Sequence, residues 1–313
     1  MRWDHRIGRR LSLRDLNILL AVAESGSMAK AATRLAISQP AISRAIADME
    51  RTLGVALLDR SPQGVEPTQY GRALLKRGLA AFDELKQGVQ DIEFLANPGT
   101  GELFIGSSSA VSQGIVLAVI DRLSRQYPRV VFHIESITPP ALYDALRERR
   151  IELGFTRLYG AVPEDDLHQE ALFEDRLVVV AGVHNPWTRR RKITLAELLH
   201  EPWTWPSVGT NFDALIAEAF RGSGLEPPRA TVYVEDVNAR IMLAATGSFL
   251  AVVTAVNLRF SARDSSIKEL PVELPTSHRL IGLITLKNRT LSPLAQLFIE
   301  HSREVSKALA KRR

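Results

Sequence analysis

Hydrophobic residues between positions 27 and 54 recur at helical spacing, in two runs separated by a tight turn. The second run repeats at intervals of four, three and four through Ile42, Ile46, Met49 and Leu53. This spacing predicts one buried stripe along a helix. Ser38 can cap the start of that helix, and Gly54 can end it. The pattern therefore predicts a helix, a short turn and a second helix, with the pair centred on about residues 28–47.

The opposite face of the second helix is small and polar. Its candidate DNA contacts are Ser38, Gln39, Pro40, Ser43 and Arg44. A helix that enters the major groove needs small residues for close approach, and it needs donors and acceptors that match base edges. We therefore interpret the pair as a DNA-reading helix-turn-helix. The alternative is two amphipathic helices of an ordinary bundle whose polar face lies in water.

A hairpin is predicted directly after this helix. A short apolar run ends at Leu58, Pro62 and Gly64 suit a turn, and a return strand can follow. Such a hairpin would form a wing beside the reading helix. Arg60 and Ser61 would then contact the DNA backbone or minor groove, and the alternative is an ordinary loop with a solvated arginine.

A long helix is predicted over residues 68–97. Its apolar positions are Leu75, Leu79, Phe82, Leu85, Val89 and Ile92. Gly78 and Gly88 each lower the helix propensity by roughly 1 kcal/mol relative to alanine. A helix weakened in this way needs a partner surface, which predicts a homodimer that presents two reading helices to a pseudo-palindromic site. The alternative is that the stripe packs within its own chain.

Strand and helix patterns alternate after the break at residues 97–101. This alternation predicts an α/β region of residues 98–313 with mostly parallel sheets. Its length suits two lobes with a cleft between them. We expect lobe I at about residues 101–165 and 275–313, and lobe II at about residues 166–274.

Ligands in such folds bind beyond the carboxyl ends of strands. The candidate effector-binding residues at such places are Ser107, Ser108, Ser109, Thr138, Thr156, Arg157 and Ser207. Arg157 is the fixed cation among them, and a guanidinium can bind a carboxylate through two parallel hydrogen bonds. The alternative for each hydroxyl taken alone is a helix cap.

Composition narrows the class of protein. The 313 residues are 45% hydrophobic and 24% charged, which is typical of an ordinary globular protein. The chain has no cysteine, which excludes disulfides and thiolate metal sites. Neither a secretory signal nor a stretch long enough to span a membrane is recognisable. We therefore expect a cytoplasmic protein with no membrane partner.

Positive charge is concentrated at the predicted DNA-binding end. Residues 1–80 hold 13 Lys or Arg against 7 Asp or Glu, a formal charge of +6. The whole chain carries +5, so the remaining residues sum to −1. Contacts with DNA phosphates require this distribution.

Motifs for other chemistry are missing from the sequence. It has no phosphate-binding glycine loop, no dinucleotide-binding fingerprint, no zinc-protease motif and no nucleophile elbow. The seven histidines lack metal-ligand spacing. The sequence therefore predicts no enzyme, no catalytic residues, no metal and no cofactor.

Four stretches resemble LysR-type transcriptional regulators. They are SMAKAATRLAISQPAISRAIADMERTLGVALLDRSPQGVEPTQYG from Ser27, GELFIG from Gly101, RQYPRVVFHIES from Arg125 and ALRERRIELGF from Ala145. The resemblance covers essentially the whole chain. It implies an α plus α/β architecture: an N-terminal winged helix-turn-helix over residues 1–67, a dimerising linker helix and a two-lobed, periplasmic-binding-protein-like effector domain.

The resemblance also implies partners and residue roles. It implies a homodimer or homotetramer on double-stranded promoter DNA, with Gln39, Pro40, Ser43 and Arg44 at the groove. Residues 154–157 read Gly-Phe-Thr-Arg and are similar to a segment of regulators of aromatic degradation, in which that arginine binds a carboxylate effector. One departure is Arg149, where the family commonly has glycine, and this predicts a differently shaped helix end.

These observations favour a ligand-responsive transcription factor whose promoter binding is modulated by a small, carboxylate-like effector between the lobes. One alternative is a constitutive DNA-binding or architectural protein, which a closed, apolar-filled cleft would favour. A second is an α/β enzyme fused to a DNA-binding module.

Overall fold

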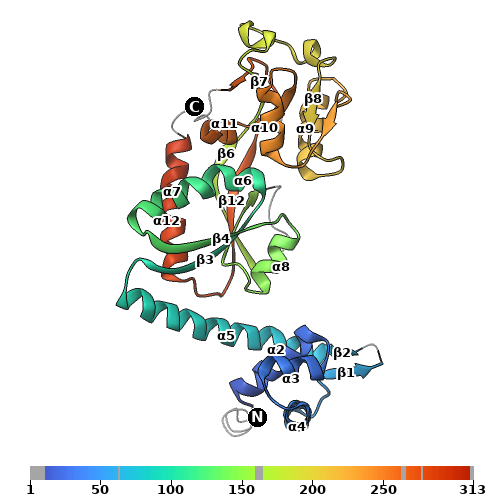
Figure 1. Ribbon diagram of the computed structural model, residues 1–313, viewed down its shortest axis with the longest axis vertical. Coiled ribbons are helices and arrows are strands. Elements are labelled where there is room, and N and C mark those ends of the chain that lie inside the picture. Colours follow the sequence, from blue (N-terminus) through green and yellow to red (C-terminus); the bar gives the residue numbers. More distant parts are fainter. Residues whose placement is uncertain (1–10, 63, 159–164, 262–265, 276–277, 311–313) are drawn as a thin grey trace. The chain divides into compact units, whose positions relative to one another are not determined.

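The computed structural model describes residues 11–310 except 63, 159–164, 262–265 and 276–277 (Figure 1). The chain divides into two compact units, one that ends at Gln90 and one that begins at Asp91. In the described residues, no helix is both long enough and apolar enough to cross a membrane.

The first unit contains three short helices and a hairpin. They are α2 (Leu13–Ser25), α3 (Met28–Leu35), α4 (Gln39–Leu53), β1 (Leu58–Ser61) and β2 (Gly64–Pro67). Ser27 caps α3 and Ser38 caps α4, each through its side-chain oxygen. Ile42, Ile46 and Met49 of α4 are fully buried in a core shared with α2 and α3, as the spacing predicts. Leu53 is exposed, because α4 ends there at Gly54.

The predicted wing is present, at a slightly different register. β1 and β2 pair antiparallel from Leu58 opposite Pro67 to Ser61 opposite Gly64. Arg60 and Ser61 therefore lie in strand β1 and not in the turn. Their backbone is fixed by the strand pairing.

The long helix α5 (Gln69–Ala96) is preceded by Thr68, whose Oγ1 accepts a hydrogen bond from the Gly71 amide at 3.0 Å. Gly71 allows a close approach, since an added Cβ would lie 2.0 Å from the carbonyl oxygen of Leu57. Further along, Leu85, Val89 and Ile92 are all more than half exposed. This end of the predicted apolar stripe is not covered by the described part of its own chain.

Lobe I of the second unit is a five-stranded sheet with helices on both faces (Figure 1). Its strand order is β4 (Arg129–Ser136), β3 (Thr100–Ser107), β5 (Leu153–Arg157), β12 (Arg279–Leu286) and β6 (Leu167–Asp175). Its helices are α6 (Ser109–Val111), the π-helical turn η2 (Ser112–Val116), α7 (Leu117–Gln126), α8 (Ala141–Arg147) and α12 (Pro293–Ala310). Helices α7 and α12 share one apolar core with the sheet, and α8 packs in another.

Lobe II is a second five-stranded sheet. Its strand order is β11 (Ile267–Glu269), β7 (Leu177–Gly182), β10 (Leu250–Thr254), β8 (Trp203–Trp205) and β9 (Val232–Tyr233). Its helices are η3 (Pro186–Arg189), η4 (Leu195–Leu198), α9 (Asn211–Gly222) and α10 (Val237–Ala245). Trp203, Trp205 and Phe220 stack edge-on or tilted in the centre of its core.

The sheets are mixed, whereas the sequence predicted mostly parallel ones. In lobe I, β3 runs parallel to β4 and β5, but β12 runs antiparallel to β5 and β6. In lobe II, β7 runs antiparallel to both of its neighbours. The reason is that the chain crosses between the lobes several times, so a returning strand enters its sheet from the opposite end.

One boundary differs from the expected division of the lobes. Strand β6 was expected in lobe II, but it pairs with β12 along its whole length and is an edge strand of lobe I. The chain therefore enters lobe II between Asp175 and Leu177. It returns when α11 (Ala255–Ser261) packs Val256 into the core of lobe I.

The end of α8 keeps the conformation that glycine would provide. Arg149 has φ 59°, in the left-handed region, and the Arg150 amide donates to the carbonyl oxygen of Ala145 at 3.0 Å. This hydrogen-bonding pattern is that of a helix ended by a left-handed residue. The expectation of a differently shaped helix end is therefore wrong.

Candidate functional sites

The start of helix α4 presents exposed polar groups. Ser38, Gln39, Pro40 and Arg44 are exposed, and the Arg44 side chain lies on the face opposite the buried stripe. Ser38 also has a structural role, because its Oγ accepts a hydrogen bond from the Ala41 amide at 3.3 Å. The apolar core beneath α4 fixes the position of this surface.

Two other predicted DNA contacts have neighbours within the protein. Ser43 is half-buried, and its hydroxyl donates to the Met28 sulfur at 3.3 Å. On the wing, Arg60 and Ser61 are both exposed. The Ser61 hydroxyl donates to the Gly64 carbonyl oxygen at 3.4 Å and so helps to close the hairpin. Arg44 and Arg60 are therefore the predicted cations that the first unit offers to solvent.

A cavity of about 620 Å³ lies between the two lobes of the second unit. Lobe I contributes the segments that follow the carboxyl ends of β3, β4 and β5, and lobe II contributes the starts of α9 and α10. Five predicted residues line the cavity: Ser108, Ser109, Thr138, Thr156 and Arg157. The cavity therefore brings together predicted residues up to about 50 positions apart in the sequence, at the strand ends where ligands bind in such folds.

Two predicted effector residues do not line this cavity. Ser107 is fully buried, and its hydroxyl donates to the carbonyl oxygen of Ser108 at 3.2 Å. Strand β3 continues through Ser107, so this side chain points into the fold. Ser207 lies just before the lining segment, and its amide donates to a Glu235 carboxylate oxygen at 3.3 Å.

Sequence reasoning missed other residues that line the cavity, among them Ser136, Phe212, Arg240 and the carboxylates of Glu235 and Asp236. The Ser136 hydroxyl lies 3.0 Å from that of Ser109. Arg240 carried a signal in the sequence, since it lies three residues after Val237 and four before Ala244, both buried in α10. An arginine at a core position of a helix is unusual and marks a buried charge.

The two arginines of the cavity are buried and share one aromatic ring. Arg157 is 8% exposed and Arg240 is 2% exposed. Their Cζ atoms lie 5.3 Å and 4.9 Å from the centroid of the Phe212 ring, a cation–π arrangement. Neither guanidinium forms an ion pair with any side chain that the structure describes. Together they place two buried positive charges in the cavity, near the carboxylates of Asp175, Glu235 and Asp236 but not in an ion pair with any of them.

Burial changes the proton affinity of Arg240 without removing its charge. It lowers the pKa of Arg240 to about 10, and the exposed carboxylates of Glu235 and Asp236 act in the opposite direction. At neutral pH the guanidinium remains protonated. Its Nε and Nη1 atoms are buried and have no hydrogen-bond partner among the described residues.

A buried carboxylate, Asp175, lies where the chain crosses between the lobes. Its Oδ1 accepts hydrogen bonds from the amides of Arg176 at 3.0 Å and Val256 at 3.2 Å. Burial raises the pKa of Asp175, and the positive charge of Arg157 partly opposes that shift. One side chain thus joins two crossings and lies within the electrostatic field of the cavity.

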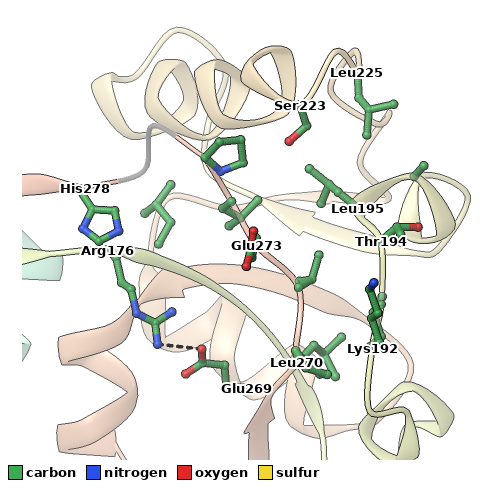
Figure 2. A pocket seen from close by; sticks show the side chains of 17 residues that line it. Arg176, Lys192, Thr194, Leu195, Ser223, Leu225, Glu269, Leu270, Glu273 and His278 are labelled. Atoms are coloured by element: carbon green, nitrogen blue, oxygen red, sulfur yellow. Dashed lines mark ion pairs between the residues drawn. The ribbon is translucent and has the colours of Figure 1, made fainter. Parts of the chain in front are cut away.

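Lobe II has a second and larger cavity, of about 1080 Å³ (Figure 2). None of the predicted effector residues lines it. Figure 2 shows Arg176 directed toward Glu269, with which it forms an ion pair of 2.9 Å. Because that arginine is neutralised, we regard the smaller interlobe cavity as the stronger candidate for anion binding.

Comparisons with known proteins agree with this architecture. The family model for the LysR substrate binding domain matches residues 96–307, and the model for the bacterial regulatory helix-turn-helix protein of the lysR family matches residues 13–72. The transcriptional regulator TfdS of Cupriavidus pinatubonensis is 31% identical over 247 residues, which is 78% of this chain and 83% of TfdS. GbpR of Azospirillum brasilense is 26% identical over 97% of this chain and 89% of its own.

Solved structures extend the likeness to the whole fold. Full-length CbnR, solved in complex with its target DNA, matches 95% of this chain and 100% of its own at a TM-score of 0.55 and 25% identity. Full-length OxyR from Pseudomonas aeruginosa matches 95% of each chain at a TM-score of 0.65 and 21% identity. With both family models matched in chain order, the protein belongs to the LysR family of transcriptional regulators and is not an enzyme.

Proposed function

We propose that this regulator binds promoter DNA through the start of α4 and the β1–β2 wing, and that a small carboxylate held by Arg157 in the interlobe cavity modulates that binding. Because it binds promoter DNA, we expect the regulator to be located in the cytoplasm. The solved complex of CbnR with its target DNA supports the first part. The exposed Arg44 and Arg60 side chains are the groups we assign to base and phosphate contacts.

The observation that carries the second part is the environment of Arg157. Arg157 is 8% exposed, lines the cavity together with Ser109, Thr138 and Thr156, and has no ion-pair partner in the described parts of the chain. A buried charge without a partner is costly, so a bound carboxylate would relieve that cost. A bidentate contact would also fix the orientation of the ligand.

The cavity argues against a constitutive regulator. A closed, apolar-filled cleft between the lobes would favour that alternative. The interlobe cavity instead has a volume within the range of small-molecule sites and is lined by hydroxyls and charges. A ligand that touches both lobes would favour one lobe arrangement over another, and this supports modulation through a population shift.

The linker helix supports self-association. Leu85, Val89 and Ile92 lie on one side of α5 and are exposed in the single chain. A second copy of α5 would cover them and would bring two α4 helices to one DNA site. We therefore propose a homodimer as the DNA-binding unit, which can associate further into a tetramer.

Titration of the full-length protein tests the effector part. Calorimetry with monomethyl esters of short dicarboxylic acids, which carry one carboxylate, should detect binding to the unchanged protein. Arg157→Ala should lower that affinity at least about tenfold, since a charged hydrogen-bonded contact is lost. Arg122→Ala, an exposed arginine paired with Glu304, is the matched control. Equal affinities for the unchanged protein and the Arg157 variant would reject the carboxylate site.

A further inference from the structure

Arg240 is the buried group that the single-carboxylate site leaves unexplained. It is 2% exposed, and its Nε and Nη1 atoms lack a hydrogen-bond partner among the described residues. A guanidinium has five N–H donors, and the two unpartnered nitrogen atoms carry three of them, so their burial has a large desolvation cost. The carboxylates of Glu235 and Asp236 line the same cavity and raise the pKa of Arg240, but neither forms an ion pair with it. Each accepts a hydrogen bond from a backbone amide: Asp236 from Ala239 at 2.8 Å, and Glu235 from Ser207 at 3.3 Å.

The position of Arg240 indicates what could use those donors. It lines the same interlobe cavity as Arg157, but from the opposite lobe. Arg157 ends strand β5 of lobe I, whereas Arg240 lies on helix α10 of lobe II. Both Cζ atoms are within cation–π distance of the Phe212 ring, so they are no further apart than the sum of those two distances.

We propose that the effector is a small dianion with one carboxylate at each end, and that Arg240 binds the second carboxylate. This inference rests on the proposed function, since it assigns the first carboxylate to Arg157. A ligand of this kind would satisfy both buried charges at once. Its middle would lie near the Phe212 ring, between the two guanidinium groups.

Binding at both ends would join the lobes. Because the two arginines belong to different lobes, a dianion can reach both only in lobe arrangements that keep them at the right separation. A monoanion of the same length satisfies one arginine and leaves the other unpaired. The second charge would therefore add affinity and also select the lobe arrangement, which links the ligand class to regulation.

The test compares each dianion with its own monoester on the full-length protein. Calorimetry at neutral pH would use succinate, glutarate and adipate, each beside its monomethyl ester, with inorganic phosphate as a compact anion. We expect the best dicarboxylate to bind at least about tenfold more tightly than its ester. Equal binding of dicarboxylate and ester, or equally tight binding of phosphate, would overturn a two-ended site. This comparison needs no variant.

Arg240→Met adds a readout that a purely structural role would not give. It should weaken dicarboxylate binding about 10- to 100-fold and leave monoester binding within about twofold. Because the substitution removes an unpaired buried charge, the ligand-free variant should melt no lower than the unchanged protein. A lower melting temperature with the dicarboxylate-to-ester ratio unchanged would assign Arg240 to the fold and overturn the proposal. Arg122→Met is the matched control.

The two proposals fail in different ways. If Arg157→Ala leaves all affinities unchanged, the carboxylate site itself is wrong. If Arg157→Ala abolishes binding but dicarboxylates and esters bind the unchanged protein alike, the proposed function stands and the role of Arg240 is wrong. Failure of every probe to bind the unchanged protein counts against both.

Discussion

The reading helix and the interlobe cavity place their arginines in opposite environments. On α4, Arg44 is exposed and the residues beneath it, such as Ile46, form an apolar core. In the cavity, Arg157 and Arg240 are themselves buried, and neither forms an ion pair with a described carboxylate, although Asp175, Glu235 and Asp236 lie near enough to act on them. The exposed arginine on α4 has no desolvation cost on folding, whereas the two buried arginines of the cavity do.

This difference indicates how each site can work. DNA phosphates and base edges can approach an exposed arginine, and water solvates it while the DNA is absent. Water does not solvate a buried arginine in this way, so an anion that binds to it stabilises the surrounding structure. The reading surface is therefore suited to recognition, and the cavity is suited to sensing.

The strongest way to break the reading surface is to remove the core beneath it. Ile46→Ala deletes a fully buried side chain and should lower the free energy of unfolding by about 2–5 kcal/mol, with loss of specific promoter binding. Urea unfolding and a footprinting assay would measure the two effects. Leu53→Ala, at an exposed position of the same helix, should cost roughly 0.5 kcal/mol or less. Similar losses in both variants would contradict the assignment of the core.

Removing the exposed charge should affect recognition alone. Arg44→Ala should weaken binding to the native promoter about 10- to 100-fold and leave stability and anion binding unchanged, because its side chain has no structural role. Arg51→Ala is the control, since Arg51 is exposed on the same helix and pairs with Asp48 at 2.8 Å. An unchanged footprint for Arg44→Ala would reject its role in reading.

The pH dependence of stability sharpens the contrast between buried and paired carboxylates. Burial raises the pKa of Asp175 above its ordinary value of 3.8, so the folded protein holds that proton more tightly than the unfolded chain. Its ionisation lowers stability as the pH rises through the range above 3.8. Asp175→Asn should therefore gain stability relative to the unchanged protein as the pH rises from about 4 to 7.

Glu170 should behave with the opposite sign. The hydrogen bond from Arg303 lowers the pKa of Glu170 below its ordinary value of 4.5, so its contribution is present above that pH and is lost as the pH falls. Glu170→Gln should be less stable than the unchanged protein at neutral pH, with the difference shrinking in acid. Unfolding in urea across this pH range measures both variants, and parallel pH profiles would contradict either assignment.

The smallest expected effect concerns the backbone of lobe I. Arg149 occupies the left-handed region at φ 59°, which is unfavourable for a residue with a Cβ. Arg149→Gly relieves that strain but makes the unfolded chain more flexible, so the net gain in stability should be below about 1 kcal/mol. Thermal unfolding would detect it, and Arg149→Ala is the control that should show no gain. A clear loss of stability in the glycine variant would contradict the account of the helix end.

The helix-turn-helix and its wing were predictable because their sequence signals are local. Caps, turn residues and the stripe through Ile42, Ile46 and Met49 all act within about one or two helical turns. The wing was predicted in the right place, but its first strand runs on from Leu58 through Arg60 to Ser61, whereas the apolar run ends at Leu58. Strand pairing decided this register, since it depends on the partner strand.

The cavity was only partly predictable, and Arg240 shows why. The sequence singled out Arg157 because it was expected directly after a strand, at an edge of the sheet where ligands bind. Arg240 lies 83 positions further along the chain, and its place among the core positions of a helix marks a buried charge without showing which cavity that charge lines. Only the packing of α9 and α10 against the strand ends of lobe I brings Arg240 and Phe212 to the same space.

By itself, the sequence determined the helix-turn-helix, the linker helix, the α/β class and the strand-end position of Arg157. These follow from periodicity and capping, which depend on neighbours in the chain. The tertiary structure decided which sheet takes β6, how the strands run, and which buried charges meet. Those outcomes depend on how the chain crosses between lobes, and residues far apart in sequence contribute no local pattern to reveal it.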